Sequence, residues 1–142
     1  MSGSAIEVRN LSKTFGGGRS LFGTERHAVK AVDQVSLVLQ RGETLAVVGE
    51  SGSGKSTLAR MLVGLEEPTF GDMQIAGRDA AALRRDGPRA FGKMVQYVFQ
   101  DPVASLNPRK MIRQALEAPL KLMNGYDAGK RQARMAELLD AM

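Results

Sequence analysis

The sequence predicts an α/β fold, because three observations agree. An apolar run of β-type residues at 45–48 stops at a glycine-rich loop, and helical spacing of leucine and methionine follows over residues 56–65. A second apolar run with strand composition lies at residues 94–99. At 142 residues, the chain is long enough to bury the core of one ordinary domain.

The opening part of the chain has the composition of a β section. Residues 5–9 and 35–39 are rich in β-formers, and the glycine-rich, charged stretch at 16–26 between them predicts a loop. A turn at residues 41–43 then leads into the apolar run that precedes the glycine-rich loop. We therefore expect residues 1–43 to form a mostly β-stranded, antiparallel section.

The middle of the chain, residues 44–100, should form the core around the glycine-rich loop. Residues 68–71 are expected to separate the first helix from a short strand at 73–75. Residues 79–85 predict a helical turn or a short helix, and the strand at 94–99 closes this part.

Residues 101–142 change to helical patterning after a polar, turn-rich segment. The spacing predicts helices over residues 109–123 and 128–142, broken at Gly125 and Gly129. Their stripe of methionine and leucine indicates helix packing and suggests no chemistry of its own.

Residues 49–57 carry the clearest chemical signal. They fit the pattern G-x-x-x-x-G-K-[ST] through Gly49, Gly54, Lys55 and Ser56. Small residues between the glycines let successive backbone N–H groups point at an anion. Lys55 supplies a positive charge for the β- and γ-phosphates, Ser56 offers a hydroxyl to Mg²⁺, and the N-terminus of the following helix attracts anions. A chance match to a flexible Gly/Ser loop is the alternative, but strand, loop and helix follow in the required order.

Composition limits the other classes of function. Cysteine is absent, which excludes disulfides and thiolate metal sites, and the single histidine, His27, lies among charged loop residues that predict a solvated side chain. No apolar run is long enough to cross a bilayer and no signal peptide is evident, so we expect the chain to stay in the cytosol. The net charge of +5 is dispersed and lacks interleaved aromatics, so nucleic acid is not an expected partner.

These motifs resemble the ATP-binding subunits of ABC transporters. The loop GESGSGKST at residues 49–57 is similar to their Walker A loop, and VFQD at 98–101 is similar to their Q-loop. The segments FQDP at 99–102 and SLNPR at 105–109 resemble the branch that imports oligopeptides and dipeptides. The resemblance covers nearly the whole chain but only about the first half of a family member.

The resemblance implies ATP and Mg²⁺ as cofactors and assigns roles to particular residues. Lys55 and Gln100 would be catalytic, and Ser56 and Gln100 would contact Mg²⁺. Phe15 would stack on adenine, although a packed strand-end phenylalanine is an alternative interpretation. The residues that would contact the nucleotide are Phe15, Gly49, Glu50, Ser51, Gly52, Ser53, Gly54, Lys55, Ser56 and Thr57.

The same resemblance implies partners and a location. Transmembrane permease subunits and a second ATP-binding subunit, identical or paralogous, would complete a transporter on the cytoplasmic face of the inner membrane. The transported substrate is expected to be a peptide, but nothing in this sequence separates peptides from nickel or glutathione.

The helical pattern stops at Met142 without a cap, which suggests a truncated nucleotide-binding domain. In the family, the LSGGQ-type signature, the Walker B strand, the D-loop and the switch histidine lie beyond this point. We therefore expect the chain by itself to hydrolyse ATP poorly, to expose apolar surface and to fold marginally. A short, non-hydrolysing nucleotide-binding regulatory module is the alternative, whereas a P-loop kinase or GTPase is disfavoured by VFQDP.

Overall fold

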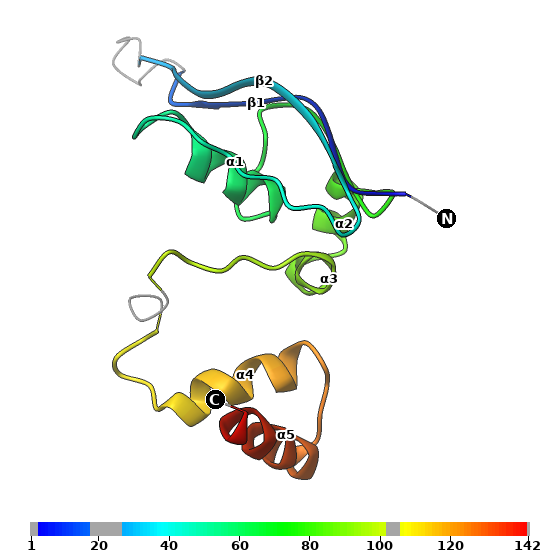
Figure 1. Ribbon diagram of the computed structural model, residues 1–142. Coiled ribbons are helices and arrows are strands. Elements are labelled where there is room, and N and C mark those ends of the chain that lie inside the picture. The colour runs from blue at the N-terminus through cyan, green and yellow to red at the C-terminus, as the bar shows by residue number, and fades with distance from the viewer. Residues whose placement is uncertain (1–2, 18–26, 102–105, 142) are drawn as a thin grey trace. The chain divides into compact units, whose positions relative to one another are not determined.

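The computed structural model describes residues 3–17, 27–101 and 106–141. The chain forms two compact units, Met1–Tyr97 and Val98–Met142 (Figure 1). The first unit contains a sheet with helices against it, and the second contains a pair of helices.

The first unit is built on an antiparallel sheet in the order β2-β1-β3-β4. Its strands are β1 (Ser4–Phe15), β2 (Val29–Gln40), β3 (Phe70–Ile75) and β4 (Arg78–Asp79). The predicted β section is confirmed, but β1 and β2 are longer than the predicted strands at 5–9 and 35–39. They continue because their ladder extends to the pair formed by Phe15 and Val29, with register shifts along the way.

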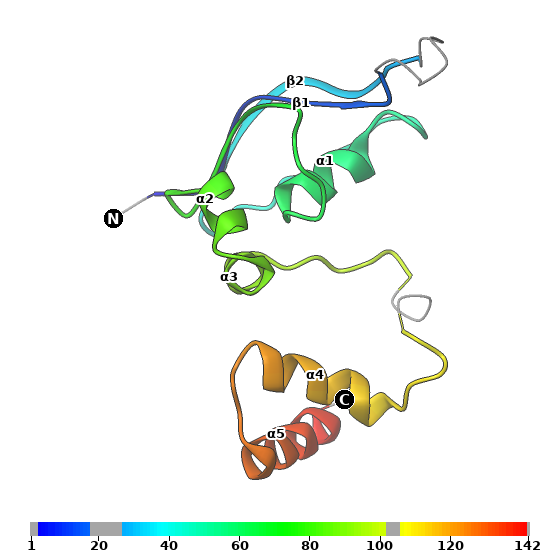
Figure 2. The same cartoon turned by 180° about the vertical axis from the view of Figure 1, so that it is seen from behind.

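Three helices belong to the same unit: α1 (Lys55–Leu62), α2 (Ala80–Arg85) and α3 (Pro88–Met94). Both views show α1 alongside β1 and β2 on one side of the sheet (Figures 1 and 2). The helix α1 ends before residue 65, where the prediction placed its end, because Gly64 adopts a left-handed φ of 75°.

The short helix at 79–85 is confirmed as α2, because the Asp79 carboxylate accepts hydrogen bonds from the N–H groups of Ala81 and Ala82 and so caps it. The helix α3 was not predicted from the sequence. Pro88 could have indicated its start, because proline is common in the first turn of a helix, where the backbone N–H has no partner within the helix.

The core of the first unit lies between the sheet and its helices. Leu11, Met61 and Leu83 are 0% exposed, and they join one strand to two helices. The remaining buried members of this cluster are Val8, Val32, Leu58, Met73, Ile75, Ala80 and Phe91. Because α1 contributes Leu58 and Met61, this helix is packed against the sheet.

The strands predicted at residues 45–48 and 94–99 are not formed, which corrects the sequence analysis. Met94 ends α3, and neither segment joins a ladder among the described residues. Val48 and Val98 are 92% and 87% exposed. The apolar composition was identified correctly, but a strand also needs neighbours for its N–H and C=O groups, and the sheet of this structure supplies none to either segment.

The second unit contains α4 (Ile112–Leu122) and α5 (Ala128–Asp140), which confirms both predicted helices with shorter bounds. Leu120 and Met135 are its buried apolar residues in the described part of the chain. The Arg131 guanidinium joins the helices through Glu117 at 3.0 Å. Over the described ranges, no helix combines the length and the apolar character that a membrane crossing requires.

Candidate functional site

The glycine-rich loop at residues 49–54 curls back on itself before α1. The Ser53 N–H donates to the Glu50 carbonyl at 3.3 Å, and Gly52 and Gly54 adopt left-handed φ values of 82° and 90°. Gly54 is the N-cap residue of α1 and supplies no side-chain hydrogen bond to the helix. The first turn of α1 is therefore capped by no side chain, as an anion-binding helix N-terminus requires.

Gly54 also fixes where the loop lies on the sheet. A Cβ atom at this position would be 2.1 Å from the Ala31 carbonyl oxygen in β2. Only glycine permits this close approach together with a left-handed backbone. The loop is thus seated directly against β2, beside Ala31.

The Lys55 side chain bends back over the loop. Its Nζ donates to the carbonyl of Gly49 at 2.8 Å and to that of Glu50 at 2.6 Å, and it lies 3.4 Å from the Ser53 hydroxyl. These contacts hold the ammonium group of the half-buried Lys55 against the loop. A positive charge, a ring of small residues and a helix N-terminus converge there, and each attracts an anion.

Ser56 and Thr57 occupy the first turn of α1. Ser56 is exposed and Thr57 is half-buried. No three His, Cys, Asp or Glu side chains of the described ranges gather into a group that could hold a metal ion. Mg²⁺ commonly binds through few protein ligands together with phosphate oxygens and water, so an exposed hydroxyl beside a phosphate loop fits that ion.

A hollow of about 720 Å³ adjoins the loop. Its walls come from β2, from residues 45–49 and from the start of α1, and most of the side chains that line it are apolar, such as Val32 and Leu58. The hollow thus continues from the loop along the exposed apolar run that failed to join the sheet.

Phe15 is the last residue of β1. The residue pairs with Val29, and Ala31 of the same strand contacts Gly54. Phe15 is 41% exposed, so the packed strand-end interpretation is not supported by burial. Phe15 does not line the hollow beside the loop. Its stacking on adenine stays a prediction.

Lys13 is a neighbour of this site that the sequence analysis missed. Its Nζ lies 5.0 Å from the centroid of the Phe15 ring. The spacing of residues 13 and 15 could have indicated this, because residues two positions apart on a strand share a face.

Gln100 lies exposed in a bend of the second unit. Its predicted contact with Mg²⁺ and with the attacking water stays a prediction, as does its catalytic role.

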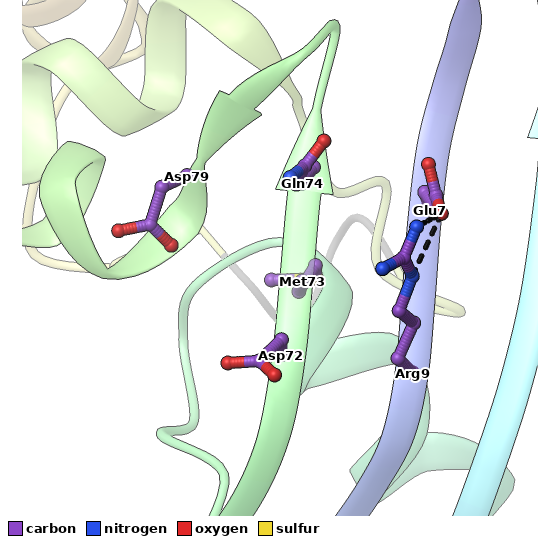
Figure 3. A pocket seen from close by; sticks show the side chains of 6 residues that line it. All are labelled: Glu7, Arg9, Asp72, Met73, Gln74 and Asp79. Atoms are coloured by element: carbon purple, nitrogen blue, oxygen red, sulfur yellow. Dashed lines mark hydrogen bonds and ion pairs between the residues drawn. The ribbon is translucent and has the colours of Figure 1, made fainter.

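A second hollow, of about 330 Å³, lies against β1 and β3 (Figure 3). Three of its four charged side chains, those of Glu7, Arg9 and Asp79, have structural partners. Arg9 forms an ion pair with Glu7 at 2.5 Å, and Asp79 caps α2. We therefore assign this hollow no chemistry.

Comparison with known proteins identifies the family to which the chain belongs. A family model described as "ABC transporter" matches residues 32–142. The chain is 42% identical over 139 residues to the probable peptide ABC transporter ATP-binding protein y4tS of Sinorhizobium fredii, covering 98% of this chain and 39% of that protein. It is 39% identical over 137 residues to the nickel import ATP-binding protein NikE of Escherichia coli O6:K15:H31, covering 96% and 50%.

A solved structure is also similar. It is the dimeric, post-hydrolysis state of the ATP-binding cassette MJ0796 bound to ADP and Pi, with a TM-score of 0.73 and 26% identity. The match covers 95% of this chain and 56% of that one. The chain therefore spans about 40 to 50% of the two relatives named above and a little more than half of the solved cassette.

Proposed function

Because the chain belongs to the ABC transporter family, we propose that it is an ATP-binding subunit of a transporter and that residues 49–57 bind the phosphates of Mg-ATP. The observation that carries this proposal is the position of the Lys55 ammonium, held by the carbonyls of Gly49 and Glu50 at the N-terminus of α1. The overall fold of this chain is similar to that of a cassette whose structure contains ADP and Pi, which supports the proposal.

Lys55 would bind the β- and γ-phosphates by exchanging partners. It now donates to two neutral carbonyls, and a phosphate oxygen is a stronger acceptor because it carries charge. The loop N–H groups and the uncapped first turn of α1 would hold the remaining phosphate oxygens. These groups stabilise negative charge without having to be assembled, which is the main contribution a protein makes to phosphoryl transfer.

Ser56 would hold Mg²⁺, and Gln100 would contribute a second contact to the ion and orient the attacking water. When bound, Mg²⁺ neutralises charge on the β- and γ-phosphates. Phe15 would stack on the adenine base, for which its exposed ring is suited. Gly49, Glu50, Ser51, Gly52, Ser53, Gly54 and Thr57 would complete the nucleotide contacts.

The transporter would couple ATP binding and hydrolysis to import. The named relatives support this, one by its peptide-transport name and one by its nickel-import name. We propose peptides as the substrate, on the similarity to y4tS and on the segments that resemble peptide importers. Transmembrane permease subunits would select the substrate, and this subunit would bind them from the cytoplasmic face of the membrane.

A second ATP-binding subunit would pair with this one, because the similar solved cassette is dimeric. Hydrolysis would belong to the assembled transporter and not to this chain by itself. The alternative of a non-hydrolysing regulatory module predicts the same ATP binding, but no phosphate release when the permease and partner subunits are supplied.

The first test is calorimetric titration of the 142-residue chain with Mg-ATP. We expect Lys55→Ala to weaken binding by roughly ten- to hundred-fold, because hydrogen bonds to a charged group are lost. Lys93→Ala is the matched control, since it removes an exposed lysine from α3. Equal affinity of Lys55→Ala and the unsubstituted chain would refute the phosphate-site assignment.

A further inference from the structure

The Lys13 ammonium is held in place by a turn that lies far away in the sequence. Its Nζ contacts the Glu66 carboxylate at 2.5 Å and donates to the Glu67 carbonyl at 2.7 Å. The side chain is only 14% exposed. A long, flexible side chain is thus fixed by two acceptors from the turn that follows α1.

The turn itself is fixed. The N–H groups of Leu65 and Glu66 both donate to the Arg60 carbonyl in α1, at 2.9 and 3.1 Å. The Thr69 N–H donates to the Ser12 carbonyl at 2.8 Å, which ties the end of this segment to β1. Lys13 therefore connects β1 to the turn that follows α1.

This anchored cation lies over Phe15, 5.0 Å from the ring centroid. A cation at this distance from an aromatic face is attracted by the ring and restrains its orientation. Ordinary strand geometry brings the two together, because residues 13 and 15 share a face of β1. The ring remains 41% exposed, so Lys13 does not bury it.

The position of Phe15 relates the ring to the phosphate loop. Phe15 pairs with Val29, and two residues farther along β2 the Ala31 carbonyl abuts Gly54. Two residues of strand span roughly 6.6 Å. The backbone partner of Phe15 is therefore two residues along β2 from the residue that abuts the glycine-rich loop. An aromatic residue and a phosphate loop at this spacing along one strand suit the base and the phosphates of one nucleotide.

We propose that Lys13 is a positioning residue for base recognition: it covers one face of the Phe15 ring and leaves the other face for the adenine of ATP. The inference rests on the proposed function and deepens it. The turn after α1, through Glu66 and Glu67, sets the position of the base platform. One helix thus carries the phosphate loop at its start and, just beyond its end, the turn that anchors Lys13.

The test compares two ligands, Mg-ATP and Mg-tripolyphosphate, because the second has the phosphates but no base. Lys13→Met keeps the length and the apolar stem of the side chain and removes its charge. We expect it to weaken ATP binding roughly two- to five-fold, the range of a cation–π contact with a solvent-exposed ring, and to leave tripolyphosphate binding unchanged. Lys93→Met is the matched control and should change neither affinity.

A double-mutant cycle separates positioning from general support of the fold. In a Phe15→Ala background, Lys13→Met should have no further effect on ATP binding, because no ring remains to be positioned. Lys13→Arg should retain most of the ATP affinity, since guanidinium also stacks on an aromatic face. Glu66→Gln gives an independent test if Lys13→Met folds poorly, because it leaves Lys13 present but less firmly held.

Two results would overturn the inference: equal weakening of both ligands by Lys13→Met, or an undiminished effect in the Phe15→Ala background. Failure of the proposed function gives a different result. In that case Lys55→Ala leaves both affinities unchanged. If Lys55→Ala weakens both ligands and Lys13→Met weakens neither, only the role of Lys13 is rejected.

Discussion

The two ends of the candidate nucleotide site are built in different ways. At the phosphate end, Lys55 bonds to Gly49 and Glu50, its close neighbours in the chain. At the base end, Lys13 bonds to Glu66 and Glu67, more than fifty residues away. The phosphate end is a local structure, whereas the base end exists only when the sheet and α1 have come together.

This difference explains why the phosphate end has a sequence motif and the base end has none. A local loop must carry its chemistry in adjacent residues, so glycines and a lysine stand at fixed spacing. A long-range contact needs only that some suitable pair meets after folding, and many pairs would serve. We therefore expect substitutions in α1, which supports both ends, to weaken the binding of the base and of the phosphates. Substitutions near one end should weaken binding at that end alone.

The largest effect should come from Met61→Ala in α1, the helix that serves both ends. Met61 is 0% exposed, and its truncation leaves a cavity in the core. We expect a loss of about 2–5 kcal/mol in the free energy of unfolding, measured by urea titration with circular dichroism.

Leu65→Ala is the matched control, because Leu65 is 59% exposed. Its cost should stay within about 0.5 kcal/mol. If Met61→Ala lowered the affinity for ATP but not for tripolyphosphate, the two ends would not share α1 as their support.

A smaller effect, confined to the phosphate end, is expected from Gly54→Ala. The new Cβ would meet the Ala31 carbonyl oxygen at 2.1 Å, and φ is 90°. We expect a destabilisation of about 2–3 kcal/mol from strain and overpacking. Calorimetry should also show weaker binding of both ATP and tripolyphosphate, since the loop must shift.

Gly52→Ala separates the clash from the backbone strain. Gly52 has a similar φ of 82°, but a Cβ there would meet no atom within 4 Å. It should cost about 1 kcal/mol, from the left-handed backbone alone. Equal costs at both glycines would show that contact with β2 does not hold the loop.

The smallest effect is expected from Thr69→Val at the base end. The Thr69 hydroxyl accepts a hydrogen bond from the Thr14 N–H at 3.1 Å, next to Phe15. Its loss should cost about 0.5–1 kcal/mol in the free energy of unfolding. The affinity for ATP should fall slightly, and the affinity for tripolyphosphate should not change. A larger fall for tripolyphosphate would show that Thr69 supports the phosphate end and not the base end.

Much of the fold could be predicted from local patterns. The helices α1, α2, α4 and α5 and the strands of the β section followed from periodicity, and their ends moved by a few residues. The errors were the strands predicted at residues 45–48 and 94–99 and the helix α3, which was not predicted. Apolar composition in those two segments indicates burial, but hydrogen-bonded strands depend on neighbours that composition does not specify.

The candidate site divides in the same way. The glycine-rich loop, Lys55 and Ser56 were predicted because their chemistry depends on spacing along the chain. Phe15 was predicted only through the resemblance to ABC transporters, and Lys13 was not predicted at all. A lysine in a strand has no distinctive pattern until its partners in another segment are known.

Local sequence patterns were enough to predict the glycine-rich loop, the helices α1, α2, α4 and α5, and the resemblance to ABC transporter ATP-binding subunits. Glycine positions, helix periodicity and motif spacing involve residues that are close in the chain, so they can be recognised in the sequence. In contrast, the contact between Gly54 and Ala31, and the ion pair with Glu66 that holds Lys13 over Phe15, are visible only in the folded structure. Those contacts join segments that approach each other only when apolar side chains from the sheet and α1 are buried together.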